Sequence, residues 1–194
     1  MLFRSVSVVT IMDIVFGFVG SDFALVCASS SVQPSIVTLT QTEDRIVEVS
    51  STKILGCSGE NGDRKQLQDY LVGNFNLYKF RNERETDMDA TAHSFRNSMA
   101  YFLRHQPYQV NLILGGVDDT TPSIYFIDYL GTMQKMNYCS HGYPSYILLS
   151  LFDRLWKKDM TREEAIELSN RCMDEMKNRF PMNEHHYITK IVSK

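Results

Sequence analysis

The sequence predicts an α+β fold in which two antiparallel sheets pack face to face and pairs of helices cover the outside. Short segments rich in β-branched residues are grouped at the beginning, middle and end of the chain, and two pairs of helical segments separate the groups. Grouped strands of this kind argue against a doubly wound parallel sheet, in which strands and helices alternate. A layered sandwich also buries the apolar face of each predicted element.

The first third of the chain is strand-like. Two apolar segments flank a Gly-Ser-Asp turn that begins at Gly20, and three β-branched segments follow them. Gly59 and Gly62 then mark the change to helical periodicity. The strands predicted here cover residues 14–19, 23–29, 36–40, 45–49 and 53–58.

Two helices are predicted next. The first covers residues 63–82, and the second starts at Thr86, whose hydroxyl is a suitable cap, and ends before Pro107. The buried face expected for the first helix is Leu67, Tyr70, Leu71, Phe75 and Tyr78. The buried face expected for the second helix is Met88, Ala92, Phe95, Met99, Phe102 and Leu103.

A second group of strands, a second helix pair and a last strand complete the prediction. A third helix is expected from Pro144 to Lys157, because proline suits a first helical position. A fourth helix opens at Thr161 with a Thr-Arg-Glu-Glu capping box. The strands of this part are expected at residues 110–117, 123–128, 133–136 and 187–192.

Length and charge describe an ordinary globular chain. It has 194 residues, a net charge of −3 and 43% hydrophobic residues, which fits one domain with a sizeable core. This charge gives no reason to expect nucleic acid or an anionic membrane as a partner. Residues 1–28 superficially suit a secretory signal peptide, which would place a mature start near Ser29. Asp13 and Ser21-Asp22 interrupt the apolar run, however, so this alternative is disfavoured.

The cysteines and histidines give no sign of a disulfide framework, a metal or a cofactor. Four widely spaced cysteines fit buried, reduced thiols in a cytoplasmic or nuclear protein. His185 and His186 are adjacent, and adjacent residues on a strand point to opposite faces, so the two imidazoles are poorly placed to share one ion. Gly115-Gly116 lacks the spacing of a phosphate-binding loop. No cofactor and no metal are therefore expected.

Five motifs, in order and at suitable spacing, make the chain resemble the beta subunits of the 20S proteasome, most of all the type-2 class at the fourth ring position. They are LYKFRN at residues 77–82, PYQVNLILGG at 107–116, YFIDYL at 125–130, HGY at 141–143 and LFDR at 151–154. The resemblance implies a four-layer αββα sandwich, the N-terminal-nucleophile hydrolase fold, over residues 12–194, with residues 1–11 as an extension. It also implies three kinds of partner: neighbouring beta subunits in a seven-membered ring, beta subunits of the opposite ring, and alpha-ring subunits.

The resemblance also identifies where an active family member carries its catalytic groups. Such a subunit attacks with the hydroxyl of an N-terminal threonine and uses its own α-amine as base. In this chain the nucleophile position falls at Met12 or Asp13, and neither residue has a hydroxyl. The catalytic aspartate is replaced by Ser29, and the lysine by Arg45, which stays charged and cannot share protons.

Two further positions of the family mechanism are also changed. Tyr143 stands where an assisting serine is expected, and Phe180 stands where a late Arg-Asp element has its acid. Gly59 matches the oxyanion-hole glycine, although a glycine at a strand-to-helix turn serves backbone geometry equally well. The resemblance therefore implies a non-catalytic, structural subunit that supports ring assembly and ubiquitin-dependent degradation by its catalytic neighbours.

An active threonine peptidase with an unusual N-terminus is the alternative. Thr10, freed by processing, would carry both a hydroxyl and an α-amine. It stands two or three residues upstream of the nucleophile position, a displacement of several ångström, about 3.3 Å per residue of strand. Val8-Val9 before it also lacks the glycine at which family members process themselves.

Overall fold

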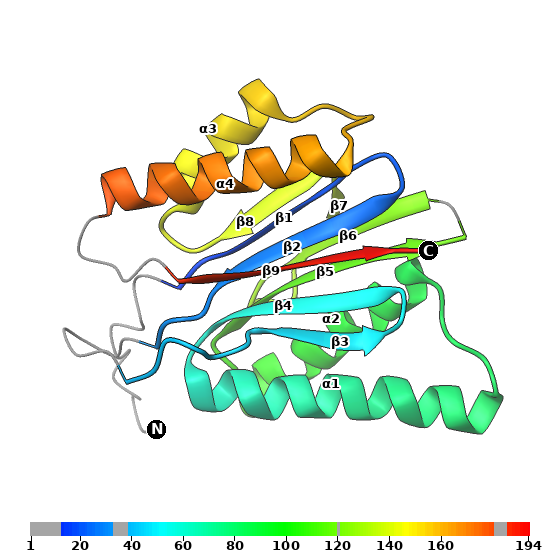
Figure 1. Ribbon diagram of the computed structural model, residues 1–194. Helices are drawn as coiled ribbons and strands as arrows, with labels where there is room; N and C mark the ends of the chain where they lie inside the picture. Colours follow the sequence, from blue (N-terminus) through cyan, green and yellow to red (C-terminus); the bar gives the residue numbers. More distant parts are fainter. Residues whose placement is uncertain (1–12, 33–38, 120, 181–185) are drawn as a thin grey trace.

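The chain folds into four layers, in which two antiparallel sheets lie between two pairs of helices (Figure 1). The structure is a computed structural model and describes residues 13–32, 39–119, 121–180 and 186–194. The predicted α+β, four-layer αββα sandwich is confirmed. None of the helices in the described ranges is both long enough and apolar enough to cross a membrane.

The first sheet has four strands in the order β8-β1-β2-β9. β1 and β2 form the hairpin around the Gly20 turn, and β8 and β9 pair antiparallel with its two outer edges. The bounds are β1 Val15–Val19, β2 Phe23–Ser29, β8 Tyr138–His141 and β9 Tyr187–Ser193.

The second sheet is a five-stranded antiparallel meander, in which sequence neighbours pair in the order β3-β4-β5-β6-β7. Antiparallel neighbours joined by short turns or by a helix pair build this order without crossing connections. The bounds are β3 Ile46–Ser50, β4 Lys53–Gly59, β5 Val110–Asp118, β6 Thr121–Ile127 and β7 Met133–Met136.

Each helix pair follows a group of strands and covers one sheet. The first pair packs against the five-stranded sheet and the second pair against the four-stranded sheet (Figure 1). The Thr161 side chain and Glu164 form the predicted capping box at the start of the fourth helix. The bounds are α1 Asn61–Asn82, α2 Met88–His105, α3 Ser145–Leu155 and α4 Arg162–Arg179.

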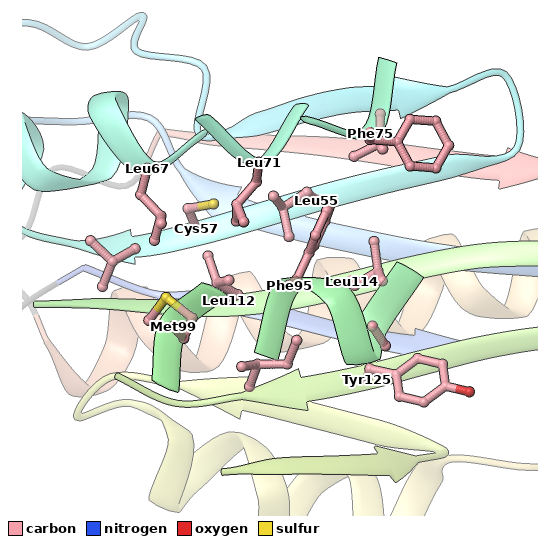
Figure 2. Packing of buried hydrophobic residues seen from close by; sticks show 14 of the residues in the cluster. Leu55, Cys57, Leu67, Leu71, Phe75, Phe95, Met99, Leu112, Leu114 and Tyr125 are labelled. Atoms are coloured by element: carbon pink, nitrogen blue, oxygen red, sulfur yellow. The ribbon is translucent and has the colours of Figure 1, made fainter. Parts of the chain in front are cut away.

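Three apolar clusters fill the spaces between the four layers. Figure 2 shows the cluster under the first helix pair, where Leu71 of α1 lies near Leu55 of β4 and Phe95 of α2 lies between Leu55 and Leu114. A second cluster, which includes Val26 and Ile113, lies between the sheets, and a third lies under α3 and α4. The start of β1 is therefore enclosed on both faces of its sheet.

The structure corrects several expectations about the strands and helix ends. The sequence patterns missed β8, a strand of only four residues. The strand expected at residues 36–40 falls largely outside the described residues, and Thr40 forms an isolated bridge with Val32. α2 is capped by Asp87, which accepts from the Ala90 N–H, rather than by Thr86. α3 ends at Leu155, two residues before the expected end.

The expected buried face of α1 is partly wrong. Tyr70 and Tyr78 are about half exposed, at 44% and 46%. Arg64 and Gln68 are buried in their place, next to Leu67 and Leu71. A helix buries polar side chains of this kind when partners satisfy them, and those partners belong to the site described next.

Candidate functional site

A buried ion pair lies where the chain enters β1. Asp13 lies two residues before this strand, and Arg45 directly precedes β3 in the other sheet. Arg45 Nη1 contacts Asp13 Oδ1, and the two side chains are 0% and 7% exposed. Arg45 Nη2 also donates to the Ser31 carbonyl oxygen at 2.8 Å. The pair therefore joins the beginnings of two strands that belong to different sheets.

The charge on Asp13 is set by two opposing effects. Burial raises the pKa of the Asp13 carboxyl above its usual value, because the charged form loses water. The Arg45 guanidinium opposes this effect most strongly, and the Gly59 backbone N–H lies close enough to lower the pKa as well. The pKa of Asp13 is raised overall, so burial outweighs the effect of the guanidinium.

Ser29 lies beside the same strand start. Its N–H donates to the Ile14 carbonyl at 3.0 Å, and its hydroxyl accepts from the Ile14 N–H at 3.4 Å. The structure thus brings together three of the six positions singled out in the sequence, namely Asp13, Ser29 and Arg45. Ser29 offers a buried hydroxyl, but its recorded bonds are to backbone.

The remaining singled-out positions are not part of this polar pair. Tyr143 is 59% exposed, although Gly142 before it lies against the Asp13 backbone. Phe180 is partly buried and packs into the apolar cluster under α3 and α4. Met12 and the alternative nucleophile Thr10 lie outside the described residues.

Polar side chains of α1, which the sequence patterns did not reveal, lie next to the ion pair. Gln68 donates to the Arg45 carbonyl at 3.3 Å, and Arg64 donates to Gln68 at 3.4 Å. Arg64 also forms an ion pair of 2.6 Å with Glu43. The available signal was the spacing of Arg64 and Gln68, which stand four residues apart between the apolar positions of the α1 stripe.

Among the described residues, the cysteines and histidines form neither a cluster of possible metal ligands nor an exposed thiol. Within the described ranges, no cluster of three His, Cys, Asp or Glu side chains could hold a metal ion, and His185 lies outside these ranges. All four cysteines are free and buried. Burial raises the pKa of Cys27 and of Cys57 to about 12, so neither thiol is a nucleophile at neutral pH.

The chain has the N-terminal-nucleophile hydrolase fold. Its two antiparallel sheets pack between helix pairs, and β1 starts at a buried polar site. A family model described as "Proteasome subunit" matches residues 13–192. The chain belongs to the proteasome subunit family and is a beta subunit.

The relatives agree with this assignment over nearly the whole chain. It is 41% identical to proteasome subunit beta type-2 of Oryza sativa subsp. japonica, covering 94% of this chain and 87% of that protein. It is 41% identical to the beta type-2 subunit of Dictyostelium discoideum, with 94% and 93% covered. It is 35% identical to proteasome subunit beta type-4 of Saccharomyces cerevisiae, with 94% of each chain covered. The resemblance to the beta type-2 class is confirmed, with beta type-4 proteins also similar.

Proposed function

We propose that this beta subunit is non-catalytic and serves the 20S core particle as a structural member of its ring. One observation carries the proposal. The family resemblance assigns the nucleophile position to Met12 or Asp13, neither of which has a hydroxyl, and the Asp13 carboxylate is held by Arg45. Acyl transfer by this family needs a hydroxyl and a free α-amine at one residue, and neither methionine nor aspartate has the hydroxyl.

The surface supports a role in assembly. Large apolar side chains that monomeric proteins usually bury are exposed on several elements, which is typical of interaction surfaces. We infer that they contact neighbouring beta subunits, beta subunits of the opposite ring and alpha subunits, in the cytoplasm and nucleus. The most exposed are Phe80 at 81%, Tyr146 at 81%, Leu39 at 70%, Tyr101 at 59% and Tyr143 at 59%.

Intact-mass analysis of native core particles tests the proposal. Particles are purified from the organism and treated with an epoxyketone, which labels N-terminal threonines. The catalytic subunits of the same particles serve as the positive control and should shift in mass, whereas this chain should stay unmodified. We expect residues 12–194 to form its folded domain, with residues 1–11 as an extension.

A chain that starts at Thr10 and carries the label would overturn the proposal in favour of an active peptidase. Substitution gives an independent check. Thr10→Ala should leave every peptidase activity of the particle unchanged, and Asp13→Ala should change the amount of assembled particle rather than remove one activity. Loss of a single peptidase activity in Thr10→Ala, with normal assembly, would contradict a structural role.

A further inference from the structure

The Asp13 carboxylate lies beside a buried cation. On one side it contacts the guanidinium of Arg45, which is fully buried. The Gly59 N–H also lies close to it and favours its charged form. The Gly59 amide is fixed in place, since this residue has a φ of +131° and a Cβ there would stand 2.1 Å from the Gln109 carbonyl oxygen. A cation and a fixed N–H group that converge on one carboxylate are typical of protein sites for small anions.

Some polar atoms of the ion pair have no hydrogen-bond partner among the described residues. Asp13 Oδ2 and Arg45 Nε are both buried and have no hydrogen-bond partner within the described part of the chain. Arg45 is 0% exposed and Asp13 is 6% exposed. These atoms could form further hydrogen bonds with a small ligand, because a free ligand can rotate into positions that a tethered side chain cannot reach.

Asp13 is the counter-ion of Arg45. The second arginine of the region, Arg64, has its own counter-ion in Glu43. Within the described residues, Arg45 has no ion-pair partner other than Asp13. Removal of the carboxylate would therefore leave a buried cation without an anion, which is a strongly unfavourable state.

We propose that Arg45, with the Gly59 amide, forms a binding site for a small carboxylate, and that the chain's own Asp13 is the built-in ligand of this site. Truncation of Asp13 to alanine removes the carboxyl group, and a formate ion has the charge and nearly the size of the lost group. The site in the Asp13→Ala variant should therefore bind formate. The proposal concerns binding and does not depend on whether the subunit is catalytic.

Chemical rescue tests the proposal on the full chain. The melting temperature of Asp13→Ala is measured in sodium formate and in sodium chloride at equal ionic strength, and in formamide, which has the shape of formate without its charge. Formate at about ten times its Kd should raise the melting temperature of the variant by about 3–6 °C over chloride. The original chain, whose site is occupied by Asp13, should show no difference between the salts.

Two further variants make the result specific. Asp13→Ala combined with Arg45→Met should lose the response to formate, because the cation of the site is gone. Asp69→Ala removes an exposed carboxylate that pairs with Lys65, so it should not respond to formate either. Equal melting temperatures of Asp13→Ala in formate and chloride, or an equal rise with formamide, would overturn the proposal. If Asp13→Ala does not fold in chloride, the yield of folded protein is compared after refolding in formate and in formamide. A higher yield in formate supports the proposal, and equal yields overturn it.

Discussion

His141 stacks on Phe126, with ring centroids 4.0 Å apart and ring planes inclined by 23°. The imidazole Nε2 also donates to the Leu112 carbonyl oxygen at 3.1 Å. His141 belongs to β8 in the four-stranded sheet, whereas Phe126 and Leu112 belong to β6 and β5 in the other sheet. One buried imidazole therefore cross-links the two sheets.

This cross-link predicts a loss of stability in mild acid. Burial lowers the pKa of His141 from 6.5 to about 4, because the charged ring loses water. Between these two values the unfolded chain binds a proton that the folded chain does not, so the stability that the neutral ring contributes is lost as the pH falls. The loss from His141 should reach roughly 3 kcal/mol at about pH 4. Urea unfolding of the full chain between pH 4 and 8 measures it.

The matched variant for this prediction is His141→Gln, which keeps a donor for Leu112 but does not titrate. It should be less stable than the original chain at pH 7, because the ring stacking is lost. Its stability should nevertheless fall less steeply from pH 6.5 to 4, by up to about 1.4 kcal/mol per pH unit. An unchanged slope would show that other groups cause the acid sensitivity.

Gly59 should not tolerate a side chain. Its φ is +131°, and a Cβ would stand 2.1 Å from the Gln109 carbonyl oxygen, a backbone atom that cannot move aside cheaply. Gly59→Ala should therefore destabilise the chain by about 3 kcal/mol or more. Gly73 lies inside α1 with no atom within 4 Å of its Cβ position, so Gly73→Ala should stabilise the chain by about 0.5–1 kcal/mol. Similar effects of the two substitutions in urea unfolding would contradict the backbone argument.

Periodicity predicted the layers of this fold well because the patterns that create layers are local. Alternating β-branched segments and the apolar stripe from Met88 to Met99 identified the strands and α2 without long-range information. β8 was missed although β7, also of four residues, was predicted; β7 pairs with its sequence neighbour β6, whereas the place of β8 depends on pairing with β1, far away in the sequence. The exposed positions of Tyr70 and Tyr78 were missed for a related reason, because a period shows which residues share a face but not where that face ends.

The site was only partly predictable from the sequence. The family resemblance located Asp13, Ser29 and Arg45 as individual positions. The ion pair, however, joins Asp13 and Arg45, which are 32 positions apart and stand before strands of different sheets. Neither composition nor spacing contains that contact. The polar neighbours Arg64 and Gln68 could have been noticed as breaks in an apolar stripe, whereas their partners appear only in the folded chain.

The capping box at the start of α4 gives a prediction that is independent of the site. The Thr161 hydroxyl accepts from the Glu164 N–H at 3.3 Å, and the Glu164 carboxylate accepts from the Thr161 N–H at 3.0 Å. Thr161→Ala should lower the free energy of unfolding by about 1 kcal/mol. The Glu164 N–H loses its side-chain acceptor, and the reciprocal hydrogen bond from the residue-161 N–H to Glu164 is no longer held in place by the capping box. Thr161→Ser keeps the hydroxyl and should cost much less. Equal losses in thermal unfolding would show that the methyl group, not the cap, is responsible.

A double-mutant cycle on Asp13 and Arg45 should reveal strong coupling. Arg45→Met leaves the Asp13 carboxylate buried without its cation, and Asp13→Ala leaves the guanidinium without its anion, so each should cost about 3–5 kcal/mol. The double variant has no unpaired charge, and its loss should be smaller than the sum of the two by about 2–3 kcal/mol. Urea unfolding of the four full-length chains measures this difference.

The exposed pair of Lys65 and Asp69 is the control for the cycle, since its atoms are 3.0 Å apart but its side chains are 68% and 65% exposed. Coupling in a solvated helix pair of this kind should be only about 0.3–0.5 kcal/mol. A coupling at Asp13 and Arg45 no larger than in the control would mean that water reaches the pair in solution. The Asp13 carboxylate would then not be held in one position by Arg45. A large coupling confined to the buried pair would instead mean that β1 and β3 are held together at this point by charge.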